Sequence, residues 1–419
     1  MKVAVLGGGS TYTPELLDGL CARAESLRVR EVALMDIDGH RLGRVGRFCQ
    51  RLAARRGGAV QVTLHEEAGP ALDGASFVVT QIRVGGQEAR ARDERLGRRH
   101  GLIGQETTGV GGFAKAMRTI PPILAYAEEV VRRAPEAWIV NFTNPSGLVT
   151  EAITSRTKAR AIGLCNIPLG FRMEIAKAVG AAPADVDLDY VGLNHLAWIR
   201  RVRVLGRDIT DLVLQHGRRG GPANFEALDY PDWFVDGLHM IPSDYLRYYY
   251  LQPEMVAQQA QKARTRAEEV MDIERELLAY YDDPAHDEKP ASLAKRGGAF
   301  YSHAACDLMA ALGRQGPTVE IVNVPNRGAV PDLPPAAVVE IPCDVSRAGA
   351  RPRPAGPLPP EIRGLMAQVK AYEELTVTAA ADRDRRAALL ALCNHPLVPS
   401  ITVAHAVLEE VIRENGLPL

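Results

Sequence analysis

The chain has 419 residues, which is long enough for two or three structural units around a large core. Its 46% hydrophobic and 24% charged residues are typical of a soluble globular protein. The net charge of −1, from 50 basic and 51 acidic residues, argues against a nucleic-acid-binding or membrane-surface protein.

The N-terminal residues do not have the pattern of an export signal. The sequence MKVAVLGGGST enters an apolar strand and a glycine turn at once, and no apolar run approaches the ~18 residues of a membrane span. Because an export signal is not recognised, we expect a cytoplasmic protein. Its six cysteines show no paired spacing, so we expect them to be free thiols. Five of them are expected to be small buried side chains: Cys21, Cys49, Cys306, Cys343 and Cys393.

The first motif is a strand, a glycine turn and a helix. Residues 2–6, KVAVL, form an apolar run, and GGGSTYTPELLDGL follows, with a helix opened by Ser10, Thr11 or Thr13 and Pro14 in its first turn. Such a turn suits a pyrophosphate, because backbone N–H groups and the helix dipole point outward. Gly7 and Gly9 fit the G-x-G-x-x-G pattern, but Tyr12 occupies the third glycine position.

Further strands extend this pattern. Residues 31–38, EVALMDID, end in acid, and Asp36 stands where a carboxylate binds the adenosine ribose of NAD; the alternative is a helix-cap or turn aspartate. Residues 76–82 precede the turn RVGG, and residues 137–147 end in Asn-Pro. The candidate cofactor-binding residues are Gly7, Gly9, Ser10, Thr11, Asp36 and Arg83. Strands alternating with helices predict an α/β fold with a doubly wound parallel sheet of the Rossmann type.

Two candidate metal ligands follow. Cys165 comes at the end of another strand, and His195 follows a short apolar stretch in DYVGLNHLAWI. Two separated ligands do not make a structural zinc site, so an open site with positions for substrate oxygens and water is the better metal hypothesis. On spacing alone, a core thiol and a core histidine remain alternatives.

A tyrosine-rich stretch and a basic segment come next. Tyr245, Tyr248 and Tyr249 would share one face of a helix, either as a packing stripe or with one tyrosine acting as a base beside a cation. Arg266 lies among acids and is either on a solvated helix face or a clamp for an anionic substrate.

Taken together, these motifs resemble glycoside hydrolase family 4, most closely its 6-phospho-β-glucosidases. The motifs that carry the resemblance, from the first strand to VVEIP at 338–342, are GGGSTYTPELLDGL, QIRVGGQEARARDE, GLIGQETTGVGGFAKAMRTIP, NFTNPSGLVTEA, CNIP, GLNH, IPSDYLRYYY and RGGAFYSHAA.

The resemblance implies roles for individual residues. It implies that Cys165 and His195 bind a divalent ion, usually Mn²⁺, and that Tyr245 is the catalytic base. It implies that Arg90, Asn144 and Arg266 contact the substrate. The family's phospho-α-glucosidases have an acidic aspartate after the metal cysteine; Asn166 stands there in this chain, which favours the β-type and a substrate contact.

The resemblance also implies the chemistry. NAD+ oxidises C3 of the sugar, the metal ion stabilises the enediolate formed after loss of the C2 proton, the C1–O bond breaks by elimination, water adds, and the sugar is reduced again. An NAD-dependent 2-hydroxy acid dehydrogenase and a non-catalytic NAD-sensing regulator remain alternatives. An unphosphorylated substrate or a 6-phosphogalactoside also remains possible.

The chain is expected to divide near Cys165. Residues 1–165 would form the NAD-binding domain, and residues 166–419 a mixed α+β domain for substrate, metal and homodimer or homotetramer contacts. Residues 346–362, rich in proline and arginine, are predicted to be an exposed connection. The sequence CNHP at 393–396 is interpreted as a helix end and turn, not as a second metal site.

Overall fold

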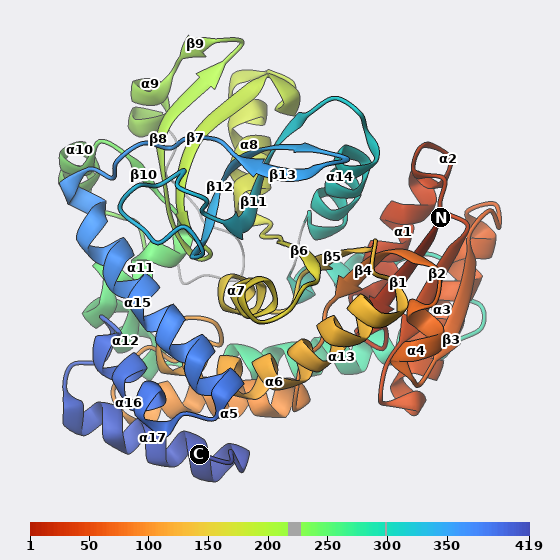
Figure 1. Ribbon diagram of the computed structural model, residues 1–419, viewed down its shortest axis with the longest axis horizontal. Coiled ribbons are helices and arrows are strands. Elements are labelled where there is room, and N and C mark those ends of the chain that lie inside the picture. The colour runs from red at the N-terminus through yellow and green to blue at the C-terminus, as the bar shows by residue number, and fades with distance from the viewer. Residues whose placement is uncertain (217–227, 298–299) are drawn as a thin grey trace.

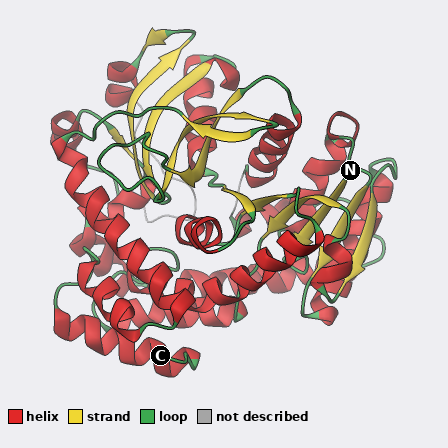
Figure 2. Cartoon of the chain, viewed as in Figure 1, coloured by secondary structure: helices red, strands yellow, loops and turns green. Residues whose placement is uncertain are grey.

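The computed structural model describes residues 1–216, 228–297 and 300–419. Its described strands form one thirteen-stranded sheet. Figure 1 shows the N-terminal strands, red to orange, on one side of the molecule and the green to blue strands on the other, with helices packed beneath both. Figure 2 shows the strands in two groups with helices around each of them. The motif at 296–305 falls partly outside the described residues, at 298–299.

The N-terminal strands run parallel in the order β3-β2-β1-β4-β5-β6. Their bounds are β1 Lys2–Leu6, β2 Glu31–Met35, β3 Gln61–His65, β4 Ala75–Thr80, β5 Trp138–Asn141 and β6 Arg160–Gly163. This is the strand order of a dinucleotide-binding sheet, so the predicted Rossmann-type fold is confirmed.

Helices bury both faces of this parallel sheet. Their bounds are α1 Thr13–Ala22, α2 Ala24–Leu27, α3 Gly39–Arg55, α4 Ala68–Leu72, α5 Gly86–Arg99, α6 Gly109–Arg133 and α7 Ser146–Arg156. Val3 and Val5 of β1 lie in one apolar cluster with residues of α1 and α3, whereas Ala4 and Leu6 lie in another with residues of α4, α6 and α7. The continuous apolar run of β1 follows from burial on both faces.

The beginning of α1 differs from the prediction. Pro14 lies in the first turn as expected, but Tyr12 is the N-cap residue and no side chain caps the helix. The Ser10 hydroxyl accepts the Tyr12 N–H at 3.2 Å, and the Thr13 hydroxyl donates to the Gly8 carbonyl at 2.9 Å. Both hydroxyls are therefore used within the turn, one residue or more away from the capping position.

The remaining strands extend the sheet beyond β6 in antiparallel pairs. Their bounds are β7 Val186–Leu193, β8 Leu196–Val204, β9 Arg207–Asp208, β10 Ile241–Pro242, β11 Thr318–Pro325, β12 Val338–Ser346 and β13 Gly349–Pro352. Asn323 of β11 pairs with Gly163 of β6, so strands from both sides of Cys165 belong to one sheet. The division of the chain near Cys165 stays a prediction.

The rest of the described chain is largely helical. The α-helices are α8 Ile167–Val179, α9 Thr210–His216, α10 Asp232–Leu238, α11 Arg247–Tyr250, α12 Gln252–Ala260, α13 Arg266–Asp282, α14 Tyr301–Gly313, α15 Pro360–Asp382, α16 Arg385–Asn394 and α17 Ile401–Asn415. The 3-10 helices are η1 Pro183–Asp185, η2 Asp244–Leu246 and η3 Ala291–Arg296. Within the described residues, no helix combines the length and apolar character that crossing a membrane requires.

The predicted exposed connection at 346–362 is wrong in part. It contains β13, which pairs with β12, and Leu358 and Ile362 are buried in the main core. The prolines suggested an exposed linker, but β13 is a short hairpin strand at the edge of the sheet, where proline is tolerated. The helix end predicted at CNHP is confirmed, because α16 ends at Asn394 and His395 follows it as the C-cap.

Candidate functional site

A cavity of about 680 Å³ lies at the carboxyl ends of the parallel strands. This is the edge where open α/β sheets bind their ligands. The predicted site residues that line it are Gly7, Ser10, Asp36, Arg83, Arg90, Asn144, Asn166, His195, Tyr245 and Arg266. Gly9, Thr11 and Cys165 lie close to it but do not line it.

The glycine turn holds the chain close to its neighbours. Gly7 has φ +89°, and a Cβ there would lie 2.8 Å from the Gln81 carbonyl oxygen. A Cβ on Gly9 would lie 2.8 Å from Oδ2 of Asp36, which accepts the Gly9 N–H at 2.9 Å. Only glycine fits both positions, so the turn and the Asp36 carboxylate form one wall of the cavity.

Thr11 is buried in a network that the sequence did not reveal. Glu274 of α13 accepts hydrogen bonds from the Thr11 hydroxyl at 3.2 Å and from Arg41 Nη2 at 2.8 Å. Arg296 of η3 donates from Nε to the Thr11 hydroxyl at 2.6 Å and pairs with Glu274 at 3.2 Å. Burial raises the pKa of Glu274, but Arg296 and Arg41 outweigh it and hold the pKa at about 2. A segment far along the chain thus supports the predicted cofactor turn.

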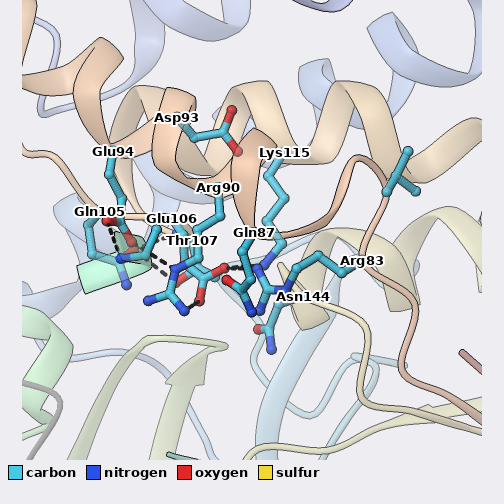
Figure 3. Close-up of polar contacts among 12 residues, drawn as sticks. Arg83, Gln87, Arg90, Asp93, Glu94, Gln105, Glu106, Thr107, Lys115 and Asn144 are labelled. Carbon is cyan, nitrogen blue, oxygen red and sulfur yellow. Dashed lines mark hydrogen bonds and ion pairs between the residues drawn. The ribbon is translucent and has the colours of Figure 1, made fainter. Parts of the chain in front are cut away.

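Figure 3 shows Arg83, Arg90 and Lys115 gathered around Glu106. Lys115 Nζ lies 2.7 Å from Oε2 of Glu106, and Arg90 Nη1 lies 3.3 Å from Oε1. Although burial favours the neutral acid, these three cations hold the pKa of Glu106 well below its usual range. The motifs GLIGQETTGVGGFAKAMRTIP and QIRVGGQEARARDE contain all four residues, but the sequence does not show that they pair. The cluster gives the cavity a fixed, cation-rich wall.

Cys165 lies two residues after the end of β6 and two residues before the start of α8. It is buried, with its sulfur near a second cavity of about 20 Å³. Burial and the charge of Glu340 raise the pKa of the thiol well above its usual value, while the backbone N–H groups of Ile167 and Asn166 and the Asn194 amide donate to the sulfur and lower it. These donors are suited to a thiolate, which a bound metal cation would stabilise.

His195 and Tyr245 are brought together, although they come from different elements. His195, with φ 65°, lies in the turn between β7 and β8, and Tyr245 lies in η2. Their rings stack at 3.6 Å between centroids with an interplanar angle of 6°. Burial, then the nearby Lys115 cation, lowers the pKa of His195 to about 3, so its imidazole is neutral near pH 7.

Burial and nearby acidic groups keep the Tyr245 hydroxyl protonated in the protein without a bound metal ion. Burial raises the pKa of Tyr245, and the nearby Cys165 and Glu106 raise it further. Tyr248 also lines the cavity, whereas Tyr249 stacks on His395 and the Tyr250 hydroxyl accepts from Trp198 at 3.2 Å. The tyrosine stretch therefore serves both packing and the cavity.

The predicted substrate contacts lie around this centre. Asn144, which precedes Pro145 in a cis peptide bond, and Asn166, the N-cap residue of α8, both line the cavity. Arg266 lies at the rim, where its guanidinium pairs with Glu269 at 2.9 Å and donates to the Lys295 carbonyl at 2.9 Å. Both of these contacts lie near the protein surface, so an anion could compete for this guanidinium.

The donor set fits a metal ion with open coordination positions. Within the described residues, no group of three or more histidine, cysteine or acidic side chains could hold an ion. A neutral imidazole and a thiol with N–H donors on its sulfur supply two ligands of the predicted kind. Cys165 and His195 are linked through Tyr245, which stacks on His195 and interacts electrostatically with Cys165.

Residues 2–181 match the family 4 glycosyl hydrolases, and residues 190–398 match the C-terminal domain of that family. A probable 6-phospho-beta-glucosidase of Bacillus subtilis is 39% identical over 99% of this chain and 96% of its own. The 6-phospho-beta glucosidase of Thermotoga maritima, solved with manganese, NAD+ and glucose-6-phosphate, is 40% identical, covers 99% of this chain and 98% of its own, and has a TM-score of 0.92. Malate dehydrogenase of Plasmodium falciparum, 12% identical with a TM-score of 0.54 over 91% of this chain and 99% of its own, shows the fold alone.

Proposed function

Because the chain belongs to glycosyl hydrolase family 4, we propose that it hydrolyses 6-phospho-β-glucosides with the help of NAD and a divalent metal ion. The observation that carries this proposal is the cavity itself. It places a glycine turn with Asp36 on one side and the stacked His195 and Tyr245 on the other, within one space of about 680 Å³.

The cofactor-binding role belongs to the turn after β1 and the end of β2. The glycines bring the backbone close to a pyrophosphate, and Asp36 would accept the ribose hydroxyl. Thr11 would act from behind the turn, through Glu274 and Arg296. Arg83, paired with Glu106, would stand beside the cofactor at the end of β4.

The metal-binding role belongs to Cys165 and His195. Bound NAD supplies reversible oxidation at C3 of the sugar, and a bound divalent ion such as Mn²⁺ supplies Lewis acidity to the sugar oxygens beside it. The thiol must lose its proton on binding the ion, so the N–H groups that face its sulfur assist this step.

Tyr245 is the proposed base for the proton at C2. The buried phenol needs positive charge nearby to ionise, and the predicted ligands Cys165 and His195 would place it there. Loss of this proton allows the C1–O bond to break without direct attack at C1. Water then adds at C1 and the hydride removed from C3 would be returned to C3, so the net change is hydrolysis and NAD+ is regenerated.

Arg90, Asn144, Asn166 and Arg266 are the proposed substrate contacts. At the rim, a 6-phosphate would compete with Glu269 for Arg266, and the buried Arg90 lines the cavity near Tyr245. The phospho-α-glucosidases of the family have an acidic aspartate at the position of Asn166. An amide cannot transfer a proton as that aspartate does, so Asn166 supports a β-linked substrate.

One feature of the site speaks against a 2-hydroxy acid dehydrogenase. Such an enzyme pairs its catalytic histidine with a carboxylate, but the partner of His195 Nδ1 is the Thr107 hydroxyl at 3.1 Å. A non-catalytic NAD sensor would need no stacked tyrosine and histidine beside a buried thiol. Turnover of a phosphorylated glucoside separates the glycosidase from both alternatives, and net NADH formation from a hydroxy acid separates the dehydrogenase from the sensor.

The direct test is an assay with p-nitrophenyl β-glucoside 6-phosphate, with and without NAD+, Mn²⁺ and a reducing agent. The proposal requires turnover that depends on all three and gives no net NADH. Net NADH formation from a hydroxy acid, or NAD binding without turnover of any glycoside, would overturn it. A cytoplasmic homodimer or homotetramer remains the prediction for location and assembly.

A further inference from the structure

Thr107 connects three residues that line the cavity, namely Gln105, His195 and Tyr245. It lies in the segment between α5 and α6 and lines the cavity. Its hydroxyl oxygen lies 2.9 Å from Oε1 of Gln105 and 3.1 Å from Nδ1 of His195, and it is hydrogen-bonded to Tyr245. Figure 3 shows Gln105 and Thr107 next to Glu106.

The direction of each hydrogen bond follows from counting protons. The backbone N–H groups of Thr107 and Thr108 both donate to the same atom of the Gln105 side chain, which must therefore be the oxygen. An amide oxygen only accepts hydrogen bonds, so the Thr107 hydroxyl donates its single proton to Gln105. The contact of the Thr107 oxygen with Nδ1 of His195 is then an acceptor contact.

The consequence for His195 is a defined tautomer. Since the Thr107 oxygen accepts, Nδ1 of His195 must carry the proton that it donates. A neutral imidazole has only one N–H, so Nε2 keeps a lone pair. Tyr245 is hydrogen-bonded to the same Thr107 hydroxyl, which holds the phenol against the imidazole ring with which it stacks.

The geometry points to Thr107 as a positioning residue, which fixes His195 in the Nδ1–H tautomer with Nε2 free for a metal ion and aligns Tyr245 beside it. This rests on the proposed function, because it assigns the free nitrogen of His195 to the metal site proposed above. Partners of a metal-binding histidine act on metal affinity through the orientation and tautomer of the ring.

The chain offers matched variants. Thr107→Val keeps the shape of the side chain and removes the hydroxyl, and Thr107→Ser keeps the hydroxyl. Thr108→Val is the control, because among the described residues Thr108 contributes only its backbone N–H to this network. Binding of Mn²⁺ alone is followed by the electron paramagnetic resonance signal of the free ion, with no sugar present.

We expect Mn²⁺ to bind Thr107→Val roughly 10- to 100-fold more weakly than it binds the unmodified chain. Thr107→Ser and Thr108→Val should bind Mn²⁺ with nearly the affinity of the unmodified chain. Unchanged affinity in Thr107→Val, or equal losses in the valine and serine variants, would overturn the inference. Thermal melting of each variant shows whether it is folded.

A second readout uses the unmodified chain and does not depend on any variant being folded. Nitrogen-15 chemical shifts of histidine-labelled protein distinguish the two tautomers, and the signal missing in His195→Gln identifies His195. The inference requires the Nδ1–H form in the metal-free protein, and the Nε2–H form would refute it. If the Nδ1–H form is found but the phosphorylated glucoside is not turned over, the proposed function fails while this inference stands.

Discussion

Glu274 provides the most direct test of how the cofactor turn is held. Its carboxylate accepts from Arg41 at 2.8 Å, Gln87 at 3.0 Å and Thr11 at 3.2 Å, and pairs with Arg296 at 3.2 Å. In Glu274→Gln, an amide N–H would replace one carboxylate oxygen, so that a donor of the side chain would face one of the neighbouring N–H or O–H donors. Both arginines would lose the charge that compensates them, and the turn would lose its support.

The size of the effect follows from the pKa of Glu274. A fall from 4.5 to about 2 corresponds to roughly 3 kcal/mol of stability at neutral pH. Because the pKa is lower in the folded protein, this contribution is present above the unfolded value of 4.5 and is lost as the pH falls toward about 2. We therefore expect Glu274→Gln to be about 3 kcal/mol less stable at pH 7, with the difference shrinking in acid.

Urea denaturation at a series of pH values measures this difference, and NAD+ titration measures the effect on the turn. Glu276→Gln is the control, since Glu276 is exposed on the same helix and its loss should change stability by less than about 0.5 kcal/mol. A loss below about 1 kcal/mol in Glu274→Gln, as for a surface ion pair, would refute the reasoning. A loss independent of pH would refute it equally.

Two further predictions concern the metal ion and the phosphate. Cys165→Ser should lose activity while remaining folded. Mn²⁺ with a reducing agent should restore the activity of wild-type protein that has been treated with a chelator. Full activity of Cys165→Ser after exhaustive chelation would contradict the role of Cys165. Arg266→Ala should lower kcat/KM for the phosphorylated substrate by roughly 30- to 150-fold, or about 2–3 kcal/mol, with Arg275→Ala as the control on the same helix. Equal turnover of phosphorylated and unphosphorylated glucosides by the wild type would contradict the phosphate assignment.

The parallel sheet could be predicted because its signals are local. Each strand is a short apolar run followed by a turn, and Gly7 and Gly9 lie where a side chain would collide with Gln81 or Asp36. The metal-binding role of His195 is predicted only by the motif GLNH and its resemblance to the family. Spacing alone left a core histidine as an alternative.

Long-range partners could not be predicted from the sequence. Glu274 and Arg296 lie 263 and 285 residues after Thr11 in the sequence. Glu106 and its partner Lys115 lie in one recognised motif, and Arg83 and Arg90 lie in another, but the motifs do not show which charges pair. Charge pairing between distant elements has no periodicity, so only the folded chain reveals it.

The central claim is that hydrolysis proceeds by oxidation and elimination, with Tyr245 as the base. This route must break the C2–H bond, whereas direct displacement at C1 leaves it intact. Tyr245→Phe keeps the ring that stacks on His195 and should slow turnover by roughly 10²- to 10⁴-fold, while Tyr249→Phe should not. Nuclear magnetic resonance of the sugar product formed in D2O tests the claim most directly. We predict deuterium at C2; a product that retains hydrogen at C2 would contradict the mechanism.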